Sequence, residues 1–177
     1  MNHTGSSPTR PEEHFDVVDQ SDNVLYALPR SEVHQQKLLH RAVHVFLFHP
    51  DGRLLIHKRS SSKEEFPSVW TSSCSGHVSA GDSYDQTAPR ELHEELGIEA
   101  VVLTRLHKFP ASAETSWEFT VLYSTSSSQN PDPDPAEISD IQWRLPDEIA
   151  DWMSHSPHDF SPAFRLLFNW YRQKHST

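Results

Sequence analysis

The sequence is poor in cysteine, in long apolar stretches and in positive charge. Its single cysteine, Cys74, excludes an internal disulfide, and no stretch approaches the ~20 apolar residues that a membrane-spanning helix needs. Lysine and arginine together number 15 against 25 aspartates and glutamates, which gives a net charge of −10. This charge works against binding to a nucleic acid polymer or an anionic membrane surface. We therefore expect a cytoplasmic protein in which a phosphate-rich ligand needs a cation to mediate its binding.

Hydrophobic residues are scarce as well. They make up 35% of the 177 residues, and the five glycines do not bring this share up to the roughly 45–50% typical of globular domains. Residues 1–13 are rich in Ser, Thr, Pro and charge and contain no apolar signal-peptide segment, so we predict a disordered tail there. The chain length fits one domain, which we place at residues 14–177.

The spacing of apolar residues predicts an α/β protein with a mixed sheet. A strand pair is expected at 15–18 and 24–28, and a hairpin at 42–48 and 54–57 around the turn His49-Pro50-Asp51-Gly52. Further strands are predicted at 69–71, 100–109, 117–123 and 138–145, and the proline-rich stretch 124–135 is predicted to be a loop. Helices are predicted at 29–37, 146–153 and 161–174. These elements favour an α/β/α sandwich.

Acidic residues are concentrated between Gly76 and Ile98. On a helix, Glu91 and Glu95 are four residues apart and Glu94 is three residues after Glu91, so the three carboxylates lie on one side. Such acids repel one another unless a cation lies among them, and Mg²⁺ (or Mn²⁺) suits oxygen ligands of this kind. Arg90 is placed to hold Glu94 by directional hydrogen bonds. Taken alone, such a run is more typical of an ordinary solvated helix face.

Pro89 leaves two starting points for this helix. Because proline lacks an N–H and clashes inside a helix, the helix either begins near Thr87, with Pro89 in its first turn, or begins at Ser83 and kinks. The spacing from Ser83 to Gln86 resembles a capping box and favours the longer helix.

The acidic segment resembles the Nudix box, whose pattern is G-x5-E-x7-R-E-U-x-E-E-x-G-U with U a bulky aliphatic residue. The first glutamate of the pattern is replaced here by Asp82, which keeps the charge and shortens the reach, so we expect it to orient the site. The matching residues are Gly76, Arg90, Glu91, Leu92, Glu94, Glu95, Gly97 and Ile98.

The resemblance implies an α/β/α fold, a Mg²⁺ or Mn²⁺ cofactor, and cleavage of a diphosphate linked to another group. It implies that Glu91 and Glu95 are the main metal ligands, that Glu94 is either a further ligand or an acid that contacts the ligands, that the Gly76 carbonyl is a candidate ligand, and that Arg90 holds the acids in place. In such enzymes a carboxylate outside the box assists as a ligand or base. Candidates for this role are Glu137 and Glu118, although each is also typical of a plain surface acid.

A second resemblance, to isopentenyl-diphosphate isomerase, covers more of the chain. That enzyme builds a metal site from three histidines and glutamates, and His34, His40 and His77 lie near the corresponding places. Glu118 matches one glutamate of the site, and Ser116 replaces another; alternatively, the histidines are structural. The resemblance is carried by Arg30-Ser31-Glu32-Val33-His34, Leu39-His40-Arg41-Ala42, Phe66-Pro67-Ser68-Val69-Trp70-Thr71 and Gly76-His77.

The catalytic cysteine of the isomerases is expected immediately before Gly76, where this chain has Ser75. A serine is far less acidic than a thiol, and Cys74, one residue earlier on an extended segment, faces the opposite side. We therefore favour a metal-dependent hydrolase of a nucleoside diphosphate derivative or similar small diphosphate. An isomerase-like enzyme and a non-catalytic nucleotide-binding Nudix module remain alternatives. The sequence leaves open both the general base (Glu94, Glu118 or Glu137) and homodimer formation.

Overall fold

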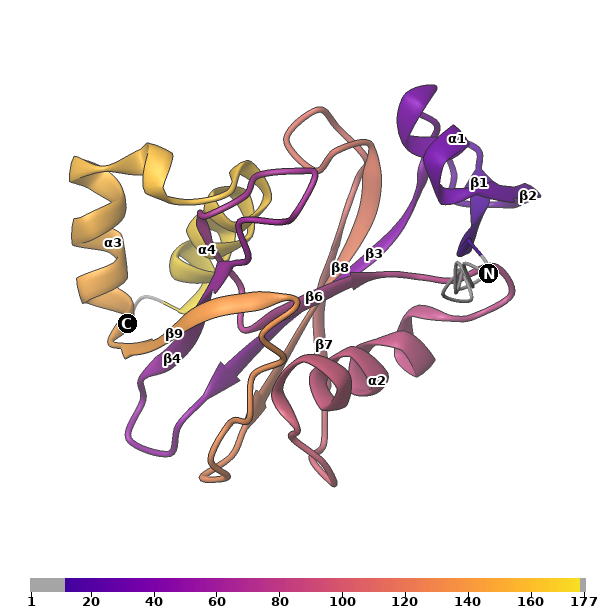
Figure 1. Cartoon of the computed structure of the whole chain (residues 1–177). Helices are drawn as coiled ribbons and strands as arrows, with labels where there is room; N and C mark the ends of the chain where they lie inside the picture. The colour runs from indigo at the N-terminus through magenta and orange to yellow at the C-terminus, as the bar shows by residue number, and fades with distance from the viewer. Residues whose placement is uncertain (1–11, 176–177) are drawn as a thin grey trace, which may run out of the picture.

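A seven-stranded mixed sheet forms the centre of the structure, a computed structural model that describes residues 12–175 (Figure 1). β3 (His40–Phe48) and β8 (Glu118–Ser126) run parallel and are paired along their whole lengths. The main strand order is β5-β4-β3-β8-β7, with β6 paired to β3 and β9 paired to β4. The remaining strands are β4 (Leu54–Arg59), β5 (Trp70–Thr71), β6 (Cys74–His77), β7 (Thr104–Phe109) and β9 (Ile138–Arg144).

Helices cover both faces of this sheet, which confirms the α/β/α sandwich. On one face, α2 (Tyr84–Leu96) buries Leu92 and Leu96 in a cluster with Val43 and Val45 of β3. On the other face, α4 (Pro162–His175) buries Phe164, Leu167 and Phe168, which lie at helical spacing as an apolar stripe, and Tyr171 is partly buried. The helices on this second face are α3 (Pro146–His155), η1 (Pro157–Asp159) and α4 (Pro162–His175).

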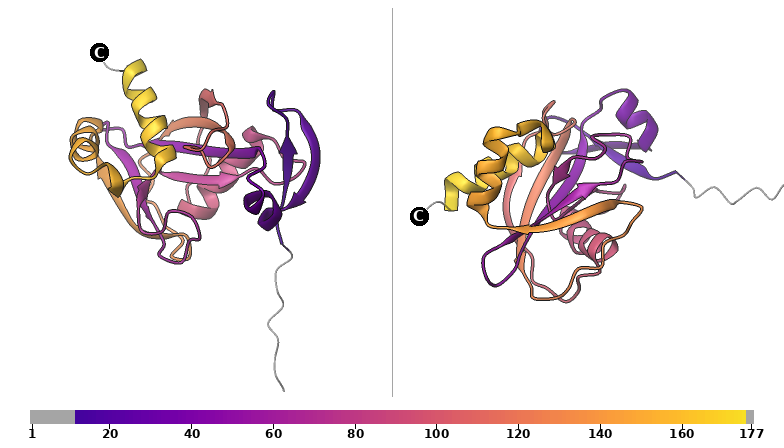
Figure 2. Two further views of the ribbon diagram at one scale, coloured as in Figure 1. Left: turned by 90° about the horizontal axis from the view of Figure 1, so that it is seen from above. Right: turned by 60° about the vertical axis from the view of Figure 1, so that its left-hand side comes forward.

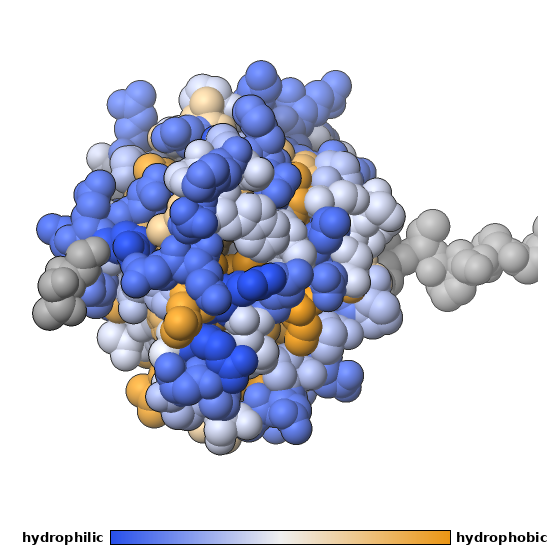
Figure 3. All heavy atoms as spheres, turned by 90° about the vertical axis from the view of Figure 1, so that its left-hand side faces the viewer, coloured by the Kyte–Doolittle hydropathy of each residue, from blue (hydrophilic) through white to orange (hydrophobic). Residues whose placement is uncertain are grey.

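The surface agrees with the low hydrophobic content of the chain. The face drawn in Figure 3 is mostly hydrophilic, with hydrophobic residues scattered singly or in small groups. Within residues 12–175, no helix is long and apolar enough to cross a membrane.

A small N-terminal unit lies at one end of the molecule (Figure 2). It consists of β1 (His14–Val18), β2 (Val24–Pro29) and α1 (Arg30–Gln35), and it has its own apolar cluster around Phe15. The tail predicted for residues 1–13 lies outside the described residues except at its last two positions. There Glu12 accepts a hydrogen bond from the Ser31 N–H at 2.8 Å, so this end of the segment is tied to α1.

Asp22, in the turn between β1 and β2, joins this unit to the main sheet. Its buried carboxylate accepts hydrogen bonds from Arg41 Nε at 2.6 Å and from the Tyr84 hydroxyl at 2.9 Å, and it also pairs with Lys108. These partners belong to β3, α2 and β7. Burial raises the pKa of Asp22, but the hydrogen bonds from Lys108, Arg41 and Tyr84 outweigh it and hold this pKa below its ordinary value.

The predicted hairpin at 42–48 and 54–57 is wrong in its pairing. Both strands form, yet β3 and β4 pair only at Phe48 and Leu54, next to the turn. Beyond this point Ser73 lies between the strands, and its hydroxyl accepts from Leu47 N at 2.7 Å and donates to Leu55 O at 2.6 Å. The strands therefore diverge, and β4 pairs instead with β5 and β9.

Two further strand boundaries differ from the predictions by three residues or more. The strand predicted at 100–109 begins only at Thr104, and β8 runs on to Ser126, into the stretch predicted as a loop, because its last residues pair with the end of β3. α2 begins after Ser83, as in the longer of the two alternatives. The capping box is complete: Ser83 Oγ accepts from Gln86 N, and Gln86 Oε1 accepts from Ser83 N.

We predict that Asp22→Asn destabilises the protein by about 3 kcal/mol, because it leaves the largely buried Arg41, and also Lys108, without their counter-charge. Asparagine tolerates the positive φ of 64° at this position, so the substitution adds no backbone strain. Urea unfolding measures the effect, with Asp140→Asn on the exposed part of β9 as the control. Equal unfolding free energies for the two variants would contradict the anchoring role of Asp22.

Candidate functional site

A cavity of about 510 Å³ lies beside the N-terminal part of β3, and residues far apart in the sequence line it. The acidic residues of α2 form one wall, and the segment Ser75–His77 of β6 forms the wall next to it. Arg59 and Lys63 bring positive charge to the same space. The cavity thus contains both oxygen ligands suited to a cation and cations suited to an anionic ligand.

The three glutamates of α2 all line the cavity but differ in burial. Glu95 is buried, and its carboxylate accepts a hydrogen bond from the Ser75 N–H at 3.3 Å. Glu91 lies against Gly76 so closely that a Cβ at that position would come within 2.2 Å of the Glu91 carboxyl carbon. The side chain of Glu94 is 59% exposed. The helix therefore presents Glu91 and Glu95 inward and Glu94 to solvent at the rim.

Arg90 contacts the acids differently from the prediction. Its shortest ion pair is with Asp82, at 2.7 Å, whereas its distances to Glu91 and Glu94 are 3.5 and 4.0 Å. Asp82 is not among the residues that line the cavity. This geometry supports an orienting role for Asp82, which holds the guanidinium beside Glu91.

The acids are electrostatically costly in this arrangement. Burial and the neighbouring charge of Glu94 raise the pKa of Glu91 from 4.5 to about 7. Burial and the charge of Glu91 raise the pKa of Glu95 well above its ordinary value. A divalent cation between these oxygens would offset the repulsion and the loss of solvation. The donor set, made of hard carboxylate oxygens, fits Mg²⁺ or Mn²⁺.

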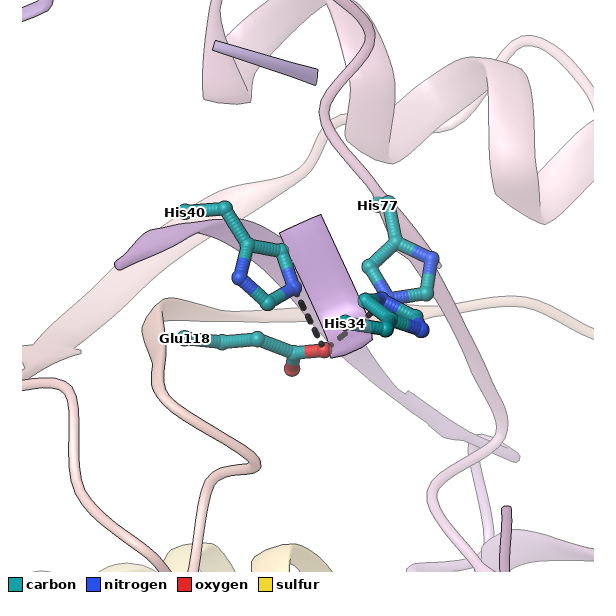
Figure 4. A group of neighbouring side chains, drawn as sticks. All are labelled: His34, His40, His77 and Glu118. Carbon is teal, nitrogen blue, oxygen red and sulfur yellow. Dashed lines mark ion pairs between the residues drawn. The ribbon is translucent and has the colours of Figure 1, made fainter. Parts of the chain in front are cut away.

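A second cluster of potential metal ligands lies beside the cavity, and two of its members, His77 and Glu118, line it (Figure 4). His34, His40, His77 and Glu118 offer four ligand atoms that all lie within 4.8 Å of one another. Glu118 Oε1 is 2.9 Å from His77 Nε2 and 3.5 Å from His40 Nε2. In Figure 4 the side chains, which come from α1, β3, β6 and β8, point toward a common centre.

This cluster also fits a metal ion. Nε2 of His34 is buried without a hydrogen-bond partner, and the buried Nε2 of His40 has only the 3.5 Å contact with Glu118, which is costly unless something else binds them. Burial and the neighbouring histidines lower the pKa of His34 to about 4, so its ring is a neutral ligand. Burial raises the pKa of Glu118, but its bonds to His40 and His77 hold that pKa below the ordinary value. A set of imidazoles with one carboxylate suits transition-metal ions such as Zn²⁺ or Mn²⁺.

The remaining predicted residues are placed as follows. Glu137 lines the cavity and pairs with Lys63. Ser75 also lines it, whereas Cys74 is 0% exposed in the core, where burial raises the pKa of its thiol. The two neighbours on β6 therefore face opposite sides, as the extended geometry predicts.

Several cavity residues escape the sequence analysis. His44 and His57 line the cavity although each stands inside a strongly apolar strand, and Arg59 and Lys63 lie in a stretch that reads as ordinary polar loop. The available signal was the occurrence of a histidine within an apolar run. Nothing in the sequence alone brings these residues to the same cavity.

Comparisons with known proteins agree with this geometry. A NUDIX domain family model matches residues 38–164. Isopentenyl-diphosphate Delta-isomerase of Nocardia farcinica is 32% identical to this chain, covering 83% of it and 87% of the relative. Prenyl-diphosphate phosphatase of Methanosarcina mazei is 34% identical and covers 84% and 88%, respectively. The crystal structure of a Deinococcus radiodurans protein superposes with a TM-score of 0.73 at 29% identity, covering 81% of this chain and 90% of that one.

The raised pKa of Glu91 predicts how metal-free stability depends on pH. Between pH 4.5 and about 7 the unfolded chain releases a proton that the folded chain keeps, so the free energy of unfolding falls as pH rises, by about 3 kcal/mol. Thermal unfolding of the wild type and Glu91→Gln across this range, with chelator, measures the difference. The wild type should lose stability relative to the variant, and added Mg²⁺ should restore more of it at pH 8 than at pH 5. Parallel pH profiles would contradict the crowding of these acids.

Proposed function

This chain belongs to the Nudix family, and on that premise we propose that it is a divalent-metal-dependent hydrolase of a small diphosphate, with a nucleoside diphosphate derivative as the preferred class. The observation that carries the proposal is the pair of inward-facing carboxylates, Glu91 and Glu95, in the wall of a cavity that also holds Arg59 and Lys63. Acids and cations that share one cavity suit a ligand that binds together with a metal ion.

Each residue of this wall has a proposed task. Glu91 and Glu95 hold the metal ion, and Gly76 lets the backbone come close enough for its carbonyl to join them. A divalent ion bound there supplies charge neutralisation of the diphosphate and lowers the pKa of a bound water. Arg59 and Lys63 bind phosphate oxygens and orient the scissile bond. Arg90, fixed by Asp82, keeps Glu91 in position.

We assign the assisting general base to Glu137. It lines the cavity and lies near enough to Glu95 for its charge to raise the pKa of that carboxyl. Glu118 is engaged by His40 and His77, and Glu94 stands exposed at the rim. A base must reach the attacking water and also have a free lone pair, which Glu137 offers when Lys63 turns to the phosphate.

We further propose a second metal ion at His34, His40, His77 and Glu118. The unpartnered Nε2 of His34 supports it, as does the Nε2 of His40, whose one contact, with Glu118, is 3.5 Å long. Within this proposal, Glu118 is the carboxylate ligand beside the imidazole ligands, and the Leu38 carbonyl oxygen, 2.8 Å from Nδ1 of His40, orients that ring so that its Nε2 faces the ion.

Isomerisation is the weaker alternative, although several relatives bear the isomerase name. A proton transfer to carbon needs an acidic group facing the substrate, and here the thiol of Cys74 lies in the core while Ser75 faces the cavity. Proton transfer by Cys74 would require the β6 segment to rotate so that the thiol faces the cavity.

We predict that Glu95→Gln lowers the Mg²⁺-dependent rate of diphosphate hydrolysis at least a hundredfold, because the main ligand loses its charge. Release of phosphate is measured on nucleoside diphosphates and isopentenyl diphosphate, and release of nucleoside monophosphate on nucleoside diphosphate sugars. Glu99→Gln, an exposed change outside the cavity, is the control. Equal rates for wild type and Glu95→Gln would contradict the role of Glu95. Conversion of isopentenyl diphosphate to dimethylallyl diphosphate would instead favour an isomerase. Metal binding without turnover of any substrate would favour a binding module.

The histidine cluster predicts a second equivalent of bound metal. With Mn²⁺ or Zn²⁺, calorimetry and metal analysis should find one equivalent fewer in His34→Ala and in Glu118→Gln than in the wild type, since each removes a ligand. His93→Ala, which removes an exposed histidine of α2, should bind as many equivalents as the wild type. Unchanged stoichiometry in both cluster variants would overturn the proposed second site.

A further inference from the structure

Two histidines line the cavity outside both the acidic wall and the histidine cluster. His44 of β3 is 6% exposed and His57 of β4 is 2% exposed, yet both contribute to the lining. They lie near each other, since the charge of His44 would lower the pKa of His57. Neither has a role in the function proposed above.

The ring of His57 is held in one tautomer. Its Nδ1 lies 2.9 Å from the Ser73 carbonyl oxygen, which can only accept, so Nδ1 carries the hydrogen. Burial lowers the pKa of His57 to about 4, and the ring is therefore neutral at physiological pH. Nε2 is then a hydrogen-bond acceptor, and no described residue donates to it.

His44 is held in a similar way. Its Nδ1 lies 2.7 Å from the Ser72 hydroxyl, and burial lowers its pKa to about 4. Because a hydroxyl can donate or accept, Nε2 of His44 can present either a lone pair or an N–H to the cavity. As with His57, no described residue bonds to this nitrogen.

The surroundings of the two rings are polar as well. Thr71 is the cross-strand partner of His57, and its hydroxyl accepts from Ser161 Oγ at 3.0 Å. Both of these residues line the cavity. A prenyl chain placed here would bury methylene groups against unpaired polar atoms, whereas a group with hydrogen-bond donors would satisfy them.

We propose that His44 and His57 bind the group attached to the diphosphate, and that they select a hydrogen-bonding group, such as a sugar or a base with a hydroxyl or N–H to donate to His57, over a prenyl chain. This inference rests on the proposed hydrolase function and adds the residues that choose its substrate. A site that offers buried acceptors discriminates strongly against a ligand that leaves them unpaired.

The test compares terminal phosphate release from three kinds of diphosphate. The four common ribonucleoside diphosphates carry hydroxyls and a base, their 2′,3′-dideoxy counterparts keep the base without ring hydroxyls, and isopentenyl diphosphate has neither. The wild type should prefer the best ribonucleoside diphosphate to isopentenyl diphosphate by at least a hundredfold in kcat/KM. A loss of activity on the dideoxy counterpart assigns the contact to the sugar, and retained activity assigns it to the base.

The variants then test the two residues. His57→Leu and His44→Leu should each lower kcat/KM on that ribonucleoside diphosphate at least tenfold and leave the value on isopentenyl diphosphate unchanged or higher. His57→Gln, which keeps an acceptor oxygen, should retain more activity than His57→Leu. His107→Leu, on β7 outside the cavity, is the matched histidine control. A wild type that favours isopentenyl diphosphate, or leucine variants with unchanged preference, would overturn the inference.

Two further measurements separate this inference from the function on which it rests. If no diphosphate is hydrolysed, the hydrolase proposal fails, and calorimetry of nucleoside monophosphates against isopentenyl monophosphate still measures the selection by His44 and His57. If the leucine variants do not fold, nuclear magnetic resonance of the His57 ring in the wild type replaces them. Its Nε2 signal should shift when the tightest-binding nucleoside monophosphate is added, and an unmoved signal at saturation would contradict the contact.

Discussion

The burial of two carboxylates beside each other, Glu91 and Glu95, is the constraint on which the site depends. Neither group gains enough from the protein to offset its lost solvation: Glu95 receives one backbone N–H, and Glu91 lies beside an arginine that is held mainly by Asp82. Gly76 contributes by having no side chain where the Glu91 carboxyl lies. Two acids kept in the wall of a cavity repel each other and lose solvation, and a divalent cation bound between them offsets both unfavourable contributions to the free energy.

The cavity itself exists because β3 and β4 separate after one pair of residues. The chain between β5 and β6 enters this gap, and the hydroxyl of Ser73 replaces the missing ladder bonds by linking the two strands. The same segment continues as β6 and lines the cavity with Ser75, Gly76 and His77 while it directs Cys74 into the core. One short stretch thus builds the wall, positions a histidine of the second cluster and removes the thiol from the site.

Three sets of polar residues share this space, and their chemistry differs. The acids of α2 suit a hard cation, the cluster around Glu118 suits an ion that accepts imidazole ligands, and the neutral rings of His44 and His57 suit a polar organic group. The relatives named for prenyl diphosphates share the family of this chain. In the function proposed here, the group beyond the diphosphate would be bound by residues outside the motif, so it could differ between relatives that share the motif.

Helices and strands that depend on interactions between residues close in the sequence can be predicted from the sequence alone. The capping residues Ser83 and Gln86 define the start of α2, and the spacing of Glu91 and Glu95 places both acids on one side of it. The alternation along β6 predicts that Ser75 and Cys74 face opposite ways, and the apolar stripe of α4 follows from its helical period.

Which strands pair depends on long-range contacts, because Ser73 enters between two segments whose local pattern is typical of a hairpin. Likewise, the gathering of His34, His40, His77 and Glu118, and the exposure of His44 and His57 to the cavity, depend on contacts between residues far apart in the chain. Local propensity does not predict such contacts, because they contribute to the stability only when the whole core packs.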